Sequence, residues 1–393
     1  MSKLLILYEF KTPTSVMMGE IFMRISEENL SDVWFIELAK VTPNDIMRAD
    51  VIIFIRPTDI LSVRIAEKAK KAEKYVIAAF DDDLMNRPAD RPIISWRRTN
   101  VKRVLNASDM VLSSNLRICN KYKSMTIEKR GVKMDTAVYP DEFRTNGKND
   151  SDIIRIVYAA NPSHAALFEK YINPAIPLFD KVAKQIKFTF IGVRPRIPKE
   201  IIPHNVQVEY VEGMSFFNYR KYMDSHDFDV GLAPLANDEF SKCKYINKFL
   251  EYAIFQIPGI FTNSEPYTHI IKDGENGYLT DNTEKDWAEC LLKVISDKAR
   301  YKRCGMNAMQ TVRMEFDADH IMQKLFKEIP EMLTYDAPER KCESFFLAKM
   351  EYLVLNVSEK IFLTAEYLKR SGIIGLKNKI IGHLKEKKVF EKV

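Results

Sequence analysis

The chain has 393 residues, of which 46% are hydrophobic and 29% are charged, so it can bury two ordinary cores and exceeds one small domain. It has no apolar run of about 18 residues or more, and its opening apolar stretch ends at Glu9, too early for a signal peptide. Its five cysteines are scattered without a C-x-x-C pair, which disfavours a disulfide framework and a zinc site. We therefore expect a cytoplasmic protein of two domains.

The net charge of +6 is concentrated at the C-terminus. Residues 369–393 contain eight Lys or Arg and two Glu, which accounts for the whole net charge and leaves the body neutral. A neutral body gives no support for a nucleic-acid partner. Apolar residues recur in this tail at near-helical spacing, so we expect it to lie on an anionic membrane surface, peripherally at the inner face. The alternative is a solvated terminal helix.

The first 140 residues alternate short apolar runs with amphipathic helical patterns such as residues 62–74. Strands that read as continuous apolar runs and are separated by single helices predict a parallel sheet covered on both faces. The polar segment 144–153 is typical of a linker. The strands expected before it are LLILY (4–8), VWFIE (33–37), VIIFI (51–55), YVIAAF (75–80), MVLSS (110–114) and TAVY (136–139).

The same pattern restarts after the linker and predicts a second parallel sheet. Two doubly wound sheets in tandem imply a cleft facing the carboxyl ends of their strands, where such folds bind ligands. The strands expected in this half are IRIVYAA (154–160), FTFIG (188–192), VQVEYVE (206–212), DVGLAPL (229–235), PGIFTN (258–263) and GYLT (277–280).

From about Trp287 onward the sequence predicts successive helices, including an apolar-rich one over residues 344–368. Four charges within this stretch argue against a membrane span and for packing across the domains: Lys349, Glu351, Glu359 and Lys360. The predicted organisation is a Rossmann-like domain over residues 1–145, a second over 151–325, and C-terminal helices with a basic tail over 326–393.

The segment KYINKFLEYAIFQIPGIFTN (244–263) predicts a helix that leads into a buried strand. At about 100° per residue its polar side chains fall within an arc of about 100°. They form either a solvated face with Lys-to-Glu pairs or a ligand face. The polar side chains are Lys244, Asn247, Lys248 and Glu251, and the core side chains are Ile246, Phe249, Leu250 and Ala253.

Further polar residues follow two predicted strands of the second sheet. Asn161, Ser163 and His164 open a helix, where free backbone N–H groups favour an anion, and Arg194 follows the next strand. The alternative interpretation is that His164 caps the helix and that Arg194 is a surface charge. Together with the 244–251 segment, these groups suit a nucleotide diphosphate. Glu251 would hold the ribose hydroxyls, and the basic groups would neutralise the pyrophosphate.

Several common catalytic motifs do not occur in the sequence, namely G-x-x-x-x-G-K-[ST], G-x-G-x-x-G, H-E-x-x-H and G-x-S-x-G. The motifs that do occur resemble the carboxyl-terminal half of GT-B glycosyltransferases, most of all the large retaining family that builds bacterial polysaccharides and glycolipids from nucleotide sugars. The resemblance covers residues 151–315. It rests on ANPSHAALFE, IGVRP, VEGMSFFNYRKYMDSHDFDVGLAPL, K-x-x-N-K-F-L-E-Y, Tyr267 and D-G-x-N-G.

The amino-terminal half resembles the same family more loosely, in IRP (55–57), FDDDL (80–84) and DMVLSSN (109–115). The resemblance implies the GT-B fold and assigns roles to the residues named above. Catalytic roles fall to Lys244, Lys248 and His164, and donor binding falls to Glu251, Asn247, Arg194, Ser163, Asn161 and Tyr267. The acceptor side would be formed by Gly19, Glu20, Arg24 and Asp82.

Two positions stand apart from the family pattern. Many members carry two glutamates in this segment, but the position eight residues before Glu251 is Cys243. The triplet Asp81–Asp83 resembles the metal-binding D-x-D of the other glycosyltransferase architecture, GT-A, but lies in the domain opposite the expected nucleotide wall. We expect no metal cofactor, and interpret the triplet as a helix cap or as a group facing the acceptor.

The function expected is transfer of a sugar from a UDP-, GDP- or dTDP-sugar to a glycan or lipid-linked acceptor, with retention of configuration. In that reaction the leaving phosphate itself deprotonates the acceptor. An inverting reaction would need a base, for which Asp82 or Glu20 would serve. The alternatives are a non-catalytic nucleotide-sugar-binding subunit and a nucleotide-sugar epimerase or hydrolase on the same fold.

Overall fold

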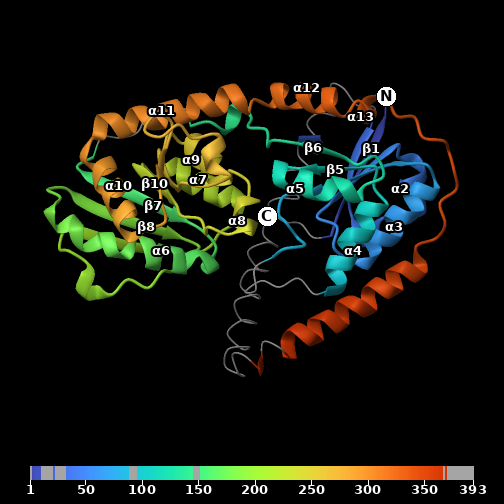
Figure 1. Cartoon of the computed structure of the whole chain (residues 1–393), viewed down its shortest axis with the longest axis horizontal. Helices are drawn as coiled ribbons and strands as arrows, with labels where there is room; N and C mark the ends of the chain where they lie inside the picture. Colours follow the sequence, from blue (N-terminus) through green and yellow to red (C-terminus); the bar gives the residue numbers. More distant parts are fainter. Residues whose placement is uncertain are drawn as a thin grey trace. The chain divides into compact units, whose positions relative to one another are not determined.

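The computed structural model describes residues 2–9, 21–22, 32–87, 95–144, 151–365 and 368–369. The chain divides into two compact units (Figure 1). Unit 1 comprises Met1–Thr136 and Ile321–Val393, and unit 2 comprises Ala137–His320. Among the described residues, no helix combines the length and the apolar character needed to cross a membrane.

Unit 1 contains a parallel six-stranded sheet in the order β2-β1-β3-β4-β5-β6. Strands β3, β4 and β5 are buried at every position because helices cover both faces, whereas edge strands β2 and β6 are half-buried. The strands are β1 (Lys3–Tyr8), β2 (Asp32–Glu37), β3 (Val51–Ile55), β4 (Tyr75–Phe80), β5 (Met110–Ser113) and β6 (Arg130–Lys133).

The helices of unit 1 come from both ends of the chain. They are α2 (Pro43–Arg48), α3 (Ile60–Lys71), α4 (Ser95–Asn106), α5 (Leu116–Tyr122) and α13 (Glu331–Thr334), with a further helix over residues 346–365. Helix α12 (Ala318–Glu328) begins in unit 2 and ends in unit 1.

One strand prediction in unit 1 is wrong. Residues 136–139 form no strand, and Val138 makes only an isolated bridge with Asp317. The sixth strand is β6, which pairs in parallel with β5. Its sequence, RGVK, has a single long apolar side chain. As an edge strand, β6 has a neighbour on one side only and is less buried than the central strands, so it needs no apolar run.

Unit 2 contains a second parallel sheet, in the order β12-β11-β10-β7-β8-β9. Each of its strands lies where the sequence predicts one. They are β7 (Ile153–Ala159), β8 (Gln185–Ile191), β9 (Val206–Val211), β10 (Val230–Ala233), β11 (Gly259–Thr262) and β12 (Tyr278–Thr280).

Two apolar cores cover the two faces of this sheet. One core includes Phe168 of α6 and Trp287 of α10, and the other includes Tyr219 of α7, Phe249 of α9 and Val312 of α11. The helices are α6 (Ala165–Tyr171), α7 (Phe216–Ser225), α8 (Glu239–Lys242), α9 (Asn247–Ala253), α10 (Glu284–Ser296) and α11 (Lys298–Glu315). The predicted doubly wound architecture is therefore confirmed.

Candidate functional site

The strand order of unit 2 reverses between β7 and β10, which are neighbours in the sheet although two strands separate them in sequence. At such a reversal the loops that leave the two strands diverge to opposite faces and open a crevice beyond the carboxyl ends. The loop after β7 holds Asn161–His164, and the chain after β10 leads to α8 and α9. Most of the predicted donor-site residues therefore follow the strands at this switch point.

Close packing of one tyrosine against a glycine fixes helix α9 on the sheet. Tyr252 is fully buried, and its hydroxyl donates to the Leu232 carbonyl at 2.8 Å. A Cβ at Gly231 would lie 2.5 Å from the Tyr252 ring, so only glycine in β10 permits this approach. The neighbouring residue on α9, Glu251, is thereby held beside the strands of the switch point.

Glu251 is partly buried and has two partners. Its carboxylate accepts a hydrogen bond from the Tyr219 hydroxyl at 3.1 Å and forms an ion pair with Lys248, one turn earlier on α9. The side chains of Glu251 and Lys248 are 22% and 27% exposed, so both are accessible to a ligand. The ammonium of Lys248 also lies 5.4 Å from the Tyr219 ring centre. The predicted Lys-to-Glu pairing on this helix is therefore confirmed for Lys248.

Buried tyrosines line the inner side of this ion pair. Burial raises the pKa of Tyr219 well above its usual range, and the nearby charge of Glu251 raises it further. The pKa of Tyr267 is raised by the same two causes in the same order. Both hydroxyls therefore stay protonated at neutral pH, and that of Tyr219 donates to Glu251. Sequence reasoning included Tyr267 but missed Tyr219, which lies in the VEGMSFFNYRKYMDSHDFDVGLAPL segment.

The helix predicted from Lys244 begins three residues later than expected. Asp238 caps the short helix α8 by accepting from the Ser241 amide at 2.7 Å, and Cys243 is the buried C-cap of that helix. Helix α9 begins only at Asn247, so Lys244 lies in the intervening turn, with its ammonium 5.0 Å from the Phe240 ring centre. The prediction that Lys244 shares a helical face with Glu251 is therefore wrong.

The polar residues after β7 surround the start of α6. Asn161 and Ser163 are exposed and His164 is half-buried, in a short 3-10 turn that precedes the helix. His164 occupies the N-cap position of α6, as the capping interpretation predicts, but its side chain makes no capping hydrogen bond. Its carbonyl accepts from the Tyr158 hydroxyl at 3.0 Å.

Arg194 follows β8 through Gly192, whose positive φ of 71° turns the chain. The guanidinium is exposed, donates to the Glu212 carboxylate and lies 5.5 Å from the Tyr210 ring centre. These are the contacts of a surface charge, which was the alternative interpretation for this residue. A ligand phosphate would have to compete with Glu212 for it.

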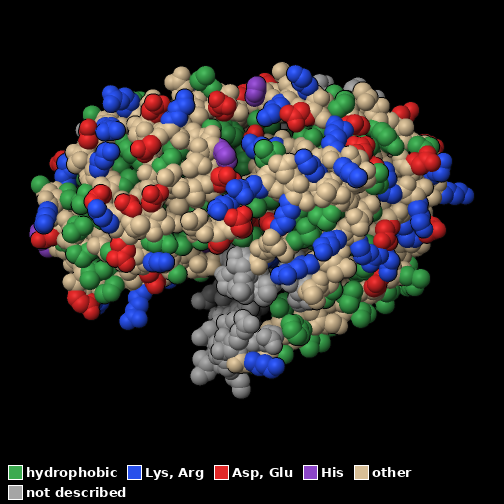
Figure 2. Space-filling view, viewed as in Figure 1, with side chains coloured by type: hydrophobic (Ala, Val, Ile, Leu, Met, Phe, Trp, Pro, Cys, Tyr) green, Lys and Arg blue, Asp and Glu red, His purple; other side chains and the backbone are tan. Residues whose placement is uncertain are grey.

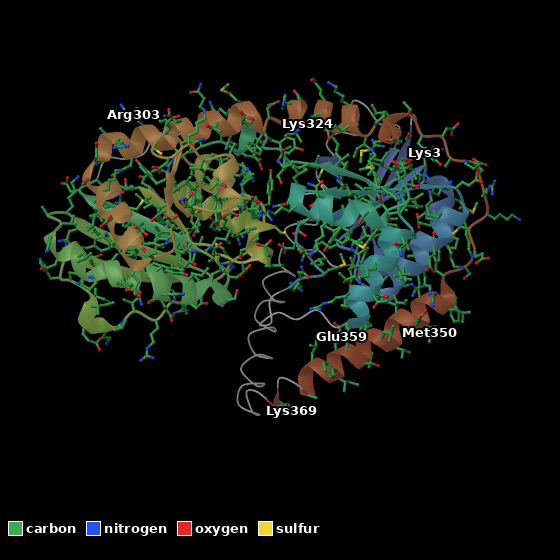
Figure 3. The ribbon with its side chains drawn as sticks, in the orientation of Figure 1. Lys3, Arg303, Lys324, Met350, Glu359 and Lys369 are labelled. Atoms are coloured by element: carbon green, nitrogen blue, oxygen red, sulfur yellow. The ribbon has the colours of Figure 1, made fainter. Side chains whose placement is uncertain are left out.

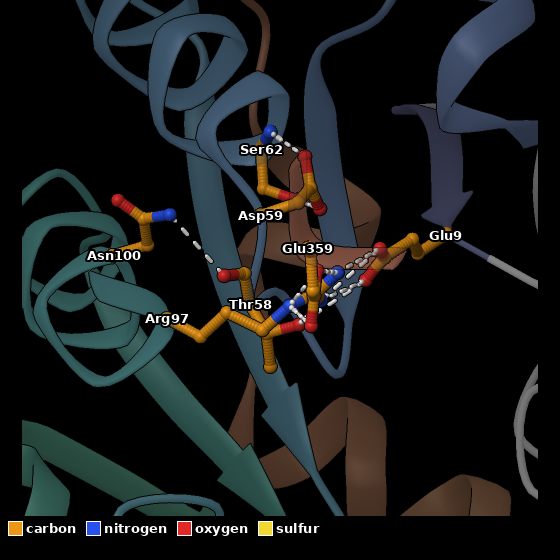
Figure 4. A network of polar contacts seen from close by, with 7 residues as sticks. All are labelled: Glu9, Thr58, Asp59, Ser62, Arg97, Asn100 and Glu359. Atoms are coloured by element: carbon orange, nitrogen blue, oxygen red, sulfur yellow. Dashed lines mark hydrogen bonds and ion pairs between the residues drawn. The ribbon is translucent and has the colours of Figure 1, made fainter. Parts of the chain in front are cut away.

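The strand order of unit 1 also reverses, between β1 and β3. Glu9 follows β1, Thr58 follows β3, and Arg97 of α4 joins them (Figure 4). The Arg97 guanidinium lies 3.1 Å from the Glu9 carboxylate and 2.7 Å from that of Glu359, and donates to the Thr58 hydroxyl at 2.6 Å. Asp59, next in sequence, caps α3 by accepting from the Ser62 amide at 2.9 Å.

This network is almost closed to solvent. The side chain of Glu9 is 8% exposed, and those of Arg97 and Glu359 are both 13% exposed. Burial and then the charge of Asp59 raise the pKa of Glu9 to about 7, against the opposing effect of Arg97. The sequence offered one signal for the cluster, since Glu9 and Thr58 each follow a predicted strand, but none for Arg97 or Glu359.

The acidic triplet after β4 forms ion pairs with basic side chains of the same chain. Arg56 donates to the Asp81 carboxylate at 2.6 and 2.8 Å and lies 3.6 Å from that of Asp82. Asp83 accepts from the Tyr122 hydroxyl at 2.7 Å and pairs with Lys121. Residues 81–86 form bends and turns, so the helix-cap interpretation is wrong.

The remaining acceptor-side predictions, Gly19, Glu20 and Arg24, lie outside the described residues. Among the residues that the structure does describe, no group of three or more His, Cys, Asp or Glu side chains is placed to hold a metal ion.

The family model described as "Glycosyl transferases group 1" matches residues 248–311, from α9 into α11. This part of the chain is therefore similar to group 1 glycosyltransferases. The matched segment contains Lys248, Glu251 and Tyr267, and it includes the D-G-x-N-G loop. In that loop Gly274 has a φ of 74°, and the Asn276 side chain accepts from the Lys272 amide at 2.8 Å, so the motif shapes a turn.

Solved structures confirm that this chain has the GT-B fold. A glycosyltransferase from Rickettsia africae superposes with a TM-score of 0.60 at 13% identity, covering 85% of this chain and 100% of its own. HepE from Anabaena, in complex with UDP and glucose, gives 0.58 at 13% identity, covering 84% and 100%. Sucrose-phosphate synthase from Thermosynechococcus elongatus gives 0.58 at 10% identity, covering 84% and 99%. No curated protein matches the chain in sequence.

Proposed function

We propose that this glycosyltransferase moves a sugar from a UDP-, GDP- or dTDP-sugar to a hydroxyl of a glycan or lipid-linked acceptor, without a metal and with retention of configuration. The product would belong to a bacterial surface polysaccharide or glycolipid. The observation that carries the proposal is the partly buried Glu251 beside the switch point of unit 2, held by Lys248 and Tyr219.

The chemistry of Glu251 suits a ribose. A carboxylate accepts hydrogen bonds through both oxygens, which matches the two neighbouring hydroxyls of a ribose. Tyr219 and Lys248 both contact the same oxygen of Glu251, Oε2, so Oε1 is available to a second donor. Binding of the diol would complete the hydrogen bonding of this carboxylate, while Tyr219 and Lys248 keep it in place.

The charges of the site suit the departing group. When the bond between the anomeric carbon and the diphosphate oxygen breaks, negative charge develops on the diphosphate. We propose that Lys248, Lys244 and His164 stabilise that charge, with Asn161, Ser163, Asn247, Arg194 and Tyr267 positioning the donor. The acceptor oxygen bonds to the anomeric carbon on the face that the diphosphate leaves, and its proton passes to a diphosphate oxygen, so no protein base is required.

Unit 1 is the proposed acceptor unit, with Gly19, Glu20, Arg24 and Asp82 on its acceptor side. The proposed domains are residues 1–145 for the acceptor and 151–325 for the donor, followed by the helices and tail of 326–393. We place the enzyme in the cytoplasm, with the basic tail on the inner face of the membrane. Except for Lys369, that tail lies outside the described residues.

The test is turnover and binding by the purified full-length protein with UDP, GDP and dTDP and their sugars. UDP is the first choice because HepE from Anabaena was crystallised with UDP-glucose. A specific ligand raises the thermal midpoint, since binding to the native state adds to its stability. Turnover that needs an added acceptor supports the proposal. Turnover without one identifies an epimerase or hydrolase, and binding without turnover identifies a non-catalytic subunit.

Glu251→Gln is the decisive variant. Removing the charge of the carboxylate should lower kcat/KM for the donor by about 10-fold or more, because a charge-assisted hydrogen bond is lost. The matched control is Glu239→Gln on the neighbouring helix α8. Glu239 forms an ion pair with Lys242, and these two residues are three positions apart, as Lys248 and Glu251 are. Equal kcat/KM in the two variants would remove Glu251 from the donor site.

A further inference from the structure

The helix over residues 346–365 turns its charges toward the protein and its apolar side chains toward solvent. Glu351 accepts from Arg64 of α3 at 3.1 Å, and Glu359 pairs with Arg97 of α4 at 2.7 Å. Ala348, on the same side, is buried. Figure 3 marks the helix by Met350 and Glu359. These ion pairs fix the rotation of the helix on unit 1.

The opposite side of the helix is a continuous apolar stripe. At about 100° per residue its members fall within an arc of about 120° over a length of about 22 Å. Their exposed fractions range from 47% for Met350 to 80% for Leu347. Figure 2 shows hydrophobic side chains gathered along this helix. The apolar stripe consists of Phe346, Leu347, Met350, Leu353, Val354, Val357 and Ile361.

This arrangement is the reverse of an ordinary surface helix, which buries its apolar side against the core. Single exposed apolar residues are common on proteins, but a contiguous stripe of this length marks a surface that is covered in use. No acidic residue interrupts the stripe. Both glutamates of the helix that contact the protein are already neutralised by arginines of unit 1.

We propose that the apolar stripe docks the enzyme on a lipid bilayer with anionic headgroups, with the helix lying in the plane of the interface. Lys349 and Lys360 border one side of the stripe, where their ammonium groups reach headgroups while their stems lie along the acyl boundary. The chain then continues directly into the basic residues 369–393. Positive charge at the border and beyond the end of the stripe complements an anionic surface.

The same charges disfavour a second copy of the chain as the occupant. If two copies met through their stripes, the lysines at positions 349 and 360 of one copy would lie near those of the other and repel them. The glutamates of the helix could not neutralise these lysines, because Glu351 is paired with Arg64 and Glu359 with Arg97. A bilayer has no such requirement, because its phosphate groups supply the counter-charge.

The position of the helix connects this surface to the proposed function. Glu359 belongs to the network at the carboxyl ends of β1 and β3, which is the edge of unit 1 where folds of this kind bind ligands. Resting on the proposed function, the inference extends to the acceptor, which would be presented by the membrane to this edge. Bilayer docking itself does not depend on catalysis.

The experiment is flotation of the full-length protein with vesicles of phosphatidylcholine alone and with about one third phosphatidylglycerol. The variant is Leu347→Gln/Val354→Gln/Val357→Gln, all exposed, and the matched control is Met306→Gln/Met314→Gln, exposed on α11 of unit 2. We expect the stripe variant to bind anionic vesicles about 10-fold less and the control to bind like the wild type. Unchanged thermal midpoints establish that each variant is folded.

Repeating the comparison in a chain that lacks residues 371–393 separates the stripe from the tail. The stripe substitutions should weaken vesicle binding in that chain as well. If they leave binding unchanged in both chains, the proposal is overturned. It is also overturned if the wild type floats with neither vesicle and the substitutions instead convert a dimer into a monomer in size-exclusion chromatography. Retained flotation of the Glu251→Gln protein would support docking even where the proposed activity fails.

Discussion

An acidic residue lies near the switch point of each unit, directly after β1 in unit 1 and on α9 in unit 2, but the two residues differ in exposure and in their partners. In unit 2, Glu251 is 22% exposed and has a lysine and a tyrosine as partners. In unit 1, Glu9 is 8% exposed, and Arg97 ties it to Thr58 and to Glu359 of the helix over residues 346–365. A reversal of strand order is thus the proposed donor site in unit 2, whereas in unit 1 it attaches a helix. Topology therefore locates a candidate site but does not assign its role.

The largest effect is expected from removing the cation of the unit 1 network. Arg97→Met leaves Glu9 and Glu359 buried without a counter-charge, so the free energy of unfolding should fall by about 3–5 kcal/mol at pH 8. Arg98→Met, at the exposed neighbouring position of α4, should change it by less than about 0.5 kcal/mol. Denaturant unfolding measures both. If both variants lose equally little free energy of unfolding, the network does not stabilise unit 1. The proposed difference between the structural network of unit 1 and the ligand site of unit 2 would then be contradicted.

The next effect is a pH dependence. Because the pKa of Glu9 is raised from 4.5 to about 7, the folded chain keeps a proton that the unfolded chain loses above its ordinary pKa. The free energy of unfolding should therefore fall as the pH rises from about 4.5 to about 7, by at most about 3 kcal/mol, and level off above. Glu9→Gln should remove this fall. Parallel pH profiles for wild type and variant would show that Glu9 titrates normally.

Sequence reasoning succeeded where the signal is local. The apolar runs of β3 and β4 predict their boundaries to the residue, and the spacing within α9 predicts which side chains are buried and that Lys248 pairs with Glu251. It failed at Lys244 because α9 begins only at Asn247, which leaves Lys244 in the turn that follows α8. It failed at β6 because an edge strand needs no apolar run.

Contacts between distant parts of the chain gave no usable signal. Tyr219 is 32 residues from Glu251, and Arg97 is 88 residues from Glu9. The local sequence around Tyr219 or Arg97 therefore does not predict which residue it contacts. The helix over residues 346–365 illustrates the same limit. Its four charges argue against a membrane span, but which side faces the protein depends on Arg64 and Arg97, which are far away in sequence.

The smallest effect sharpens the unit 2 side of the comparison. Tyr219→Phe removes one hydrogen bond to Glu251 but keeps the ring beneath the Lys248 ammonium, so the position of the carboxylate should loosen without a loss of charge. We expect the donor KM to rise by about 3–10-fold, the equivalent of about 1 kcal/mol, with kcat nearly unchanged. Tyr222→Phe, one turn along α7 and stacked on His226, is the matched control and should change KM by less than about 2-fold.

In the Glu251→Gln background the effect of Tyr219→Phe should shrink, because the two residues act through one hydrogen bond. Full additivity of the two substitutions would instead mean that Tyr219 contributes to donor binding independently of Glu251.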